Sequence, residues 1–156
     1  MVLETFLETL RQYIKDNVQD PNQDRWSQGE EWVYTENTVT QAAKYPLVHI
    51  QPVSNPRTVD GVNSSKRRVT GRIQITIWWS LQDTFSPVGG EDVVQPSYAL
   101  ETLTENIAAL IDDNQSTLTA QTNIRSVKTI DCNRTPALKK TLIKNDLDIQ
   151  IQWRTK

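Results

Sequence analysis

Few side chains in this chain are of the types that carry out chemistry. The single histidine, His49, lies in the apolar stretch PLVHIQPV, and acid–base catalysis would require a positioned partner beside it. We therefore interpret His49 as a packed or half-exposed strand residue. The single cysteine, Cys132, has no histidine next to it in the sequence and is interpreted as a small buried or half-buried residue. One cysteine also excludes an intrachain disulfide and a multi-cysteine metal site.

The acidic doublets and the glycine pair do not complete a binding motif. Glu91-Asp92 and Asp112-Asp113 carry oxygen ligands for a hard cation, but a metal-binding loop needs several spaced ligands. The pair Gly89-Gly90 lacks the lysine of a phosphate-binding loop, and no serine has nucleophile-elbow spacing. We therefore predict no catalytic residue, no metal site and no cofactor, and we expect that the protein is not an enzyme.

A cluster of basic residues lies in the segment 54–68. Its sequence, SNPRTVDGVNSSKRR, carries Arg57, Lys66, Arg67 and Arg68, and its Asn-Pro, Asp-Gly and Ser-Ser pairs predict a loop. We interpret the segment as the tip of a long hairpin. Such a basic tip is usually solvated. The alternative is contact with phosphate or with an acidic partner surface, although the interleaved aromatic residues of nucleic-acid platforms are missing.

Length and composition indicate one globular domain that folds in water and spans residues 1–156. Hydrophobic residues are 37% of the chain, charged residues are 23%, and the formal net charge is −2. A net charge this close to zero does not indicate binding to nucleic acid or to an anionic membrane. The start, MVLETFLETLRQYIKDNV, lacks the pattern of a signal peptide. No stretch approaches the roughly 18 apolar residues of a membrane helix, so no membrane contact is expected.

The spacing of apolar residues predicts an α+β fold with a mainly antiparallel sheet. A period of three and four predicts helices at 2–18 and about 96–113, with Pro96 in the first turn of the second helix. Alternation predicts strands, and Pro46 and Pro52 favour an edge position or an early stop for the first full one. Two helices should pack on one face of the sheet, with long loops on the other side and edges. Strands are predicted at 46–53, 69–81, 124–131 and 142–155, with a possible short one at 32–35, and 131–140 is predicted to be a loop.

The polar segment 19–45 lacks a clear period, and long unstructured runs inside compact domains are usually functional. Disordered linkers are poor in aromatic residues, whereas this segment contains Trp26 and Trp32. We therefore expect residues 19–45, which we call the arm, to pack onto something.

Two adjacent tryptophans in the stretch RRVTGRIQITIWWSLQD must point to opposite faces of a strand. Trp79 continues the row of Ile73, Ile75, Ile77 and Leu81 and should lie in the core. Trp78 continues the polar row that contains Arg72, which the helices cannot cover. A loop of the same chain, such as the arm, could cover Trp78. Alternatively, another subunit could cover Trp78, because Trp and Arg are enriched at interface centres.

The layout of these elements resembles that of the small tail-terminator (tail-completion) proteins of long-tailed bacteriophages and related tailed viruses. The resemblance consists of an N-terminal amphipathic helix, VLETFLETLRQYI, and a strand pair around a long loop, PLVHIQPV…RRVTGRIQITIWWS. The helix PSYALETLTENIAALID and the terminal strand LDIQIQW complete it. It covers nearly the whole chain and rests on element order and size.

The resemblance implies a non-enzymatic virion protein, assembled in the host cytoplasm, that forms a hexameric ring. Such a ring caps the tail tube and joins it to the neck, so the implied partners are further copies of this chain, the tail tube protein and a neck or head-completion protein. The arm with Trp26 and Trp32, the tip, and the face with Trp78 and Arg72 would then make the contacts. DNA that passes through the ring could touch the basic tip.

Two alternatives to a tail terminator stay open at the level of sequence. Head–tail adaptor and head-closure proteins of the neck share much of this layout. A nucleic-acid-binding module that uses the basic tip is an alternative of another class. That module would need several aromatic residues on one exposed strand face, and only Trp78 qualifies.

Overall fold

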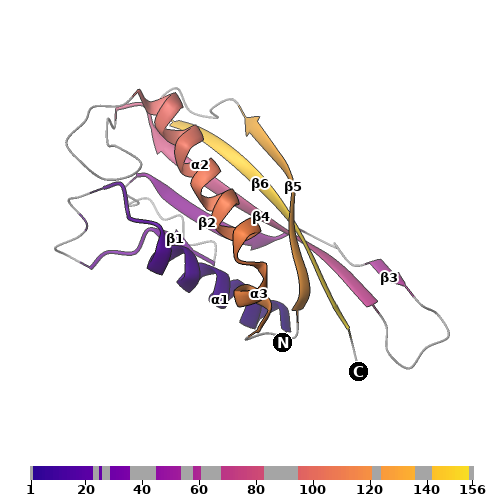
Figure 1. The fold of residues 1–156 in the computed structure, drawn as a ribbon. Coiled ribbons are helices and arrows are strands. Elements are labelled where there is room, and N and C mark those ends of the chain that lie inside the picture. The colour runs from indigo at the N-terminus through magenta and orange to yellow at the C-terminus, as the bar shows by residue number, and fades with distance from the viewer. Residues whose placement is uncertain are drawn as a thin grey trace.

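The computed structural model is an α+β fold in which helices cover one face of a mainly antiparallel sheet (Figure 1). This confirms the predicted fold class. The structure describes residues 2–22, 25, 29–35, 45–53, 58–60, 68–82, 95–120, 124–135 and 142–154. Its elements in chain order are α1 (Val2–Asn17), β1 (Val33–Tyr34), β2 (Leu47–Pro52), β3 (Thr58–Asp60), β4 (Arg68–Ser80), α2 (Pro96–Asp113), α3 (Gln115–Ala120), β5 (Ile124–Thr135) and β6 (Leu142–Arg154).

The sheet has the strand order β1-β2-β4-β6-β5, with β3 paired to β4 outside this path. The strands β1 and β2 are parallel, and the other pairs are antiparallel. The central pair joins β4 to β6 along all 13 residues of each, from Arg68 opposite Arg154 to Ser80 opposite Leu142. Because both strands alternate apolar and polar residues in the same register, one face of the pair is apolar and the other is polar.

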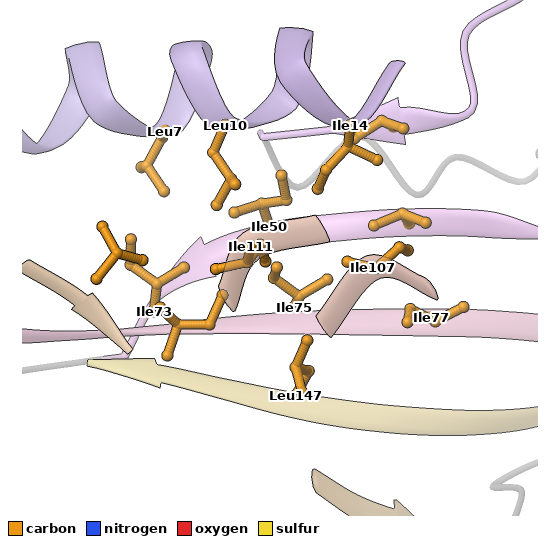
Figure 2. Packing of buried hydrophobic residues seen from close by; sticks show 14 of the residues in the cluster. Leu7, Leu10, Ile14, Ile50, Ile73, Ile75, Ile77, Ile107, Ile111 and Leu147 are labelled. Atoms are coloured by element: carbon orange, nitrogen blue, oxygen red, sulfur yellow. The ribbon is translucent and has the colours of Figure 1, made fainter. Parts of the chain in front are cut away.

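The core lies between the apolar sheet face and the helices α1 and α2. All six sheet residues predicted to face the helices are completely buried: Ile73, Ile75, Ile77, Trp79, Ile149 and Ile151. Figure 2 shows Leu7, Leu10 and Ile14 of α1 pointing toward these strands, with Ile107 and Ile111 of α2 beside them. None of the described helices is long and apolar enough to cross a membrane.

The described part of segment 19–45 is built into the domain. Trp32 is 4% exposed and belongs to the core cluster with Val33. The guanidinium of Arg25 donates two hydrogen bonds to Asp20, at 2.8 Å from Nε and 2.6 Å from Nη2, and Nη2 also donates to the carbonyl of Pro46 at 2.6 Å. This buried cluster ties the chain that follows α1 to the start of β2.

A second set of contacts ties α1 to β1. The carboxylate of Glu31 lies 3.2 Å from Arg11 Nη2 and 2.7 Å from Lys15 Nζ, and Arg11 Nε donates to the carbonyl of Val33. The phenol of Tyr34 donates to the carbonyl of Glu31, and burial raises the pKa of Tyr34 above its ordinary value of 10.0 against the opposing effect of Arg25. The arm is therefore anchored to its own domain at both ends of its described part.

Four local expectations are corrected by strand pairing. Residues 58–60, predicted to be loop, form β3 because they pair with the first residues of β4. Strand β5 runs to Thr135, into the predicted loop 131–140, because β6 continues to offer it partners. Strand β2 lies between β1 and β4 and is not an edge, although it does stop early, at Pro52. Leu81 is 45% exposed because β4 ends at Ser80. The short helix α3 was not predicted from the sequence.

Gly71 lies where the apolar row of β4 passes under the indole of Trp153. A Cβ atom at this position would be 2.9 Å from Trp153 Cζ3 and 3.0 Å from Cη2. We expect Gly71→Ala to lower the free energy of unfolding by about 1–3 kcal/mol, because a buried indole has to shift. Urea unfolding followed by circular dichroism measures this cost. Ala at Thr70, on the partly exposed side of the strand, is the matched control and should cost clearly less. Equal costs would contradict the steric explanation.

Candidate functional site

The face of the sheet opposite the helices is the candidate site, and we call it the uncovered face because none of the described helices packs on it. Coverage is uneven, since Leu47, His49 and Thr76 on this face are buried while Arg72 is exposed. Its residues follow from the pleat and the register, because β2, β4, β6 and β5 present their polar rows on this side. It contains Leu47, His49 and Gln51 of β2; Thr70, Arg72, Gln74, Thr76 and Trp78 of β4; Lys144, Asp146, Asp148, Gln150 and Gln152 of β6; and Ser126 and Lys128 of β5.

Trp78 lies at one end of the uncovered face, between Leu47 and Lys144. The register places Leu47 directly opposite Trp78 on β2 and Lys144 directly opposite on β6. Lys144 Nζ lies 5.2 Å from the centroid of the indole, which is the geometry of a cation–π contact. Lys144 and Leu47 flank the indole, and it stays partly exposed.

Polar side chains form a row of contacts along the same face from Trp78 toward Arg72. Thr76 Oγ1 donates to Asp146 Oδ1 at 2.9 Å, and Asp146 Oδ2 is 3.8 Å from Lys144 Nζ. Farther along, Arg72 Nη2 is 3.7 Å from Asp148 Oδ2, and the Arg72 side chain is 49% exposed. These contacts link side chains of β4 to side chains of β6. The row therefore combines the buried Thr76, partly exposed carboxylates and the exposed Arg72 with one partly exposed indole at its end.

The structure brings together two of the four residues predicted to form an interface. Trp78 and Arg72 share the uncovered face. Trp32 is buried in the core of its own chain, where it anchors β1. Trp26 lies outside the described residues, and so do Arg57, Lys66 and Arg67 of the basic tip. The remaining tip residue, Arg68, is the first residue of β4.

Two functional candidates on the surface were missed by reading the sequence. Lys144 contacts Trp78 although 66 residues separate them, so only the pairing of β4 with β6 reveals the contact. Tyr98 of α2 is 66% exposed, and its position before the first apolar residue of the helix was the available signal.

The residues considered for chemistry are dispersed. His49 is buried on β2, and Asp112 and Asp113 end α2. Cys132 is exposed on β5, so its interpretation as a buried or half-buried residue is wrong. The pairs Glu91-Asp92 and Gly89-Gly90 lie outside the described residues. Within the described part of the chain, no three His, Cys, Asp or Glu side chains lie close enough together to hold a metal ion.

No protein-family model matches the sequence, and no curated protein is similar to it.

Proposed function

We propose that this chain is a structural protein that assembles into a ring with copies of itself, as a terminator at the end of a phage-type tail tube. The observation that carries the proposal is the uncovered face, where a partly exposed tryptophan lies among polar side chains. Interfaces concentrate their binding energy in such aromatic residues surrounded by polar groups. The element order and the α+β fold support the same proposal through the resemblance to tail terminators.

Assembly through the uncovered face is favoured because the indole of Trp78 exposes apolar area to water. Covering apolar surface contributes roughly 25 cal/mol for each Å² removed from water. In a closed ring, each subunit uses one surface to contact a different surface of the next. The uncovered face supplies one of these two surfaces. The tube and neck proteins are the further partners in the proposal, and the virion tail is its location.

Trp78→Asp tests the role of this face. We expect the variant to fold, because Trp78 is partly exposed, and to lose ring formation, because a carboxylate replaces the apolar contact in the interface. Sedimentation velocity measures assembly, and circular dichroism measures folding. Trp78→Phe is the matched control, since it keeps an aromatic ring against Lys144 and should assemble. A folded Trp78→Asp variant that assembles like the wild type would sink the interface proposal.

Negative-stain images distinguish the tail terminator from its neighbours in the neck. Wild-type protein mixed with isolated tail tubes should form caps on tube ends. Binding to DNA-filled heads and not to tubes would instead favour a head–tail adaptor or head-closure protein.

A further inference from the structure

The charges of this chain are segregated. Residues 57–72, which lead into and along the first part of β4, contain five basic residues and one acidic residue. Helix α2 contains four acidic residues and neither lysine nor arginine. The net charge of the whole chain is only −2, so the separation arises from where the charges are placed along the sequence. Because α2 packs on the apolar face of the sheet, its acids lie on the other side of the sheet from the uncovered face.

The basic surface is the end of the uncovered face near β3, and we call it the basic end. Arg72 and Lys128 lie in one row that crosses β4, β6 and β5, so two strand spacings, about 10 Å, separate their backbones. Both side chains are exposed. Farther along β4 and β6, Arg68 and Arg154 are directly opposite each other. Figure 1 shows this end of β4, together with β3, reaching beyond the helices.

The acidic surface is a line of exposed residues along α2, and we call it the outer stripe. Tyr98, Glu101, Glu105 and Asp112 follow one another at helical spacing, and all four are exposed. Tyr98 gives the stripe an apolar contact at its start. Asp112 and its neighbour Asp113 lie at the C-terminal end of the helix, where the helix dipole disfavours negative charge. Asp112 Oδ1 also accepts a hydrogen bond from the backbone N–H of Thr129 at 3.4 Å, which links the end of α2 to β5.

We propose that the outer stripe of α2 on one copy of this chain docks against the basic end of the next copy. The inference rests on the proposed ring, because a head-to-tail ring needs two different and complementary surfaces on each subunit. One surface is acidic with an exposed tyrosine, and the other is basic with the partly exposed Trp78 on the same face. Opposite charges set the order and direction of the contact, and like charges reject the reversed one.

Two charge-reversed variants test this contact. The acid-reversed variant is Glu105→Lys with Asp112→Lys, and the base-reversed variant is Arg72→Glu with Lys128→Glu. Each variant alone should assemble at least about tenfold more weakly than wild type, because its reversed residues then face residues of the same sign on the next copy. An equimolar mixture should co-assemble, because each contact in an alternating ring again joins opposite charges. Sedimentation velocity measures the ring in all three samples.

The control for the acid-reversed variant is Glu4→Lys with Asp16→Lys, which makes the same change of charge at exposed positions of α1 and should assemble normally. Circular dichroism confirms folding. If Arg72→Glu beside Asp148 unfolds the chain, Lys128→Glu alone serves as the base-reversed variant.

The outcomes separate this contact from the ring itself. Wild-type protein that stays monomeric overturns the ring and the contact together. If wild type and each reversed variant all form normal rings, the contact is overturned and the ring stands. If both variants are folded but their mixture fails to co-assemble, the contact is overturned as well. If the base-reversed variant assembles normally but no longer retains duplex DNA, the basic end binds nucleic acid and does not make the proposed contact.

Discussion

Replacing Arg25 with alanine is expected to lower the free energy of unfolding by about 3–5 kcal/mol. The Arg25 side chain is 1% exposed and that of its partner Asp20 is 10% exposed, so the ion pair is shielded from water. Removing the guanidinium leaves the Asp20 carboxylate buried without its opposite charge. It also leaves the Pro46 carbonyl without the hydrogen bond from Nη2. Urea unfolding followed by fluorescence and by circular dichroism measures the loss.

Two controls separate burial of the charge from loss of the contact. Arg11→Ala removes an ion pair in which the partner, Glu31, is 41% exposed, together with the hydrogen bond from Nε to the Val33 carbonyl. Exposed pairs contribute only about 0–1 kcal/mol and a typical hydrogen bond about 0.5–1.5 kcal/mol. The double variant Arg25→Met with Asp20→Leu removes both buried charges and should cost less than Arg25→Ala alone. An Arg25→Ala variant as stable as Arg11→Ala would contradict a buried, uncompensated carboxylate.

Trp79→Ala is expected to cost about 3–5 kcal/mol, far more than the same change at Trp78. Trp79 is completely buried among the residues that face the helices, so truncation leaves a large cavity in the core. Trp78 is partly exposed, and truncating it removes a surface contact with Lys144. The two residues share chemistry and neighbouring positions, so the difference measures which face of β4 the helices cover. Urea unfolding of both monomeric variants in parallel, well below the assembly concentration, checks it.

Similar costs at the two positions would contradict the assignment of faces. The slope of the unfolding free energy with urea should stay the same in both variants if each still unfolds from a folded monomer.

The two proposals about assembly use surfaces that these stability variants leave alone. Arg25 and Trp79 act inside the domain, whereas Trp78, the basic end and the outer stripe lie on its surface. A variant that loses assembly with an unchanged free energy of unfolding therefore reports on a surface. A variant that loses both reports on the fold.

The sequence by itself determined the faces and the extents of the longest elements. Side chains alternate across a strand with a period of two, so the row from Ile73 to Trp79 was assigned to the core from its spacing. A period of 3.6 likewise placed a helix at 96–113, as found for α2, and one at 2–18, which ends one residue earlier as α1. The polar side of β4, with Trp78 and Arg72, followed from the same alternation. These properties are local, because neighbouring residues carry the whole pattern.

Only the tertiary structure decided which segments pair and which polar groups become buried. Strand β3 and the last residues of β5 lack a strong local pattern and are strands because β4 and β6 offer them free backbone groups. The burial of Arg25 depends on Asp20 and Pro46, which only the folded chain brings around it. The contact of Lys144 with Trp78 exists because two distant strands share one register. Strand pairing and the contact of Arg25 with Pro46 are long-range, and the spacing of residues along the chain does not contain them.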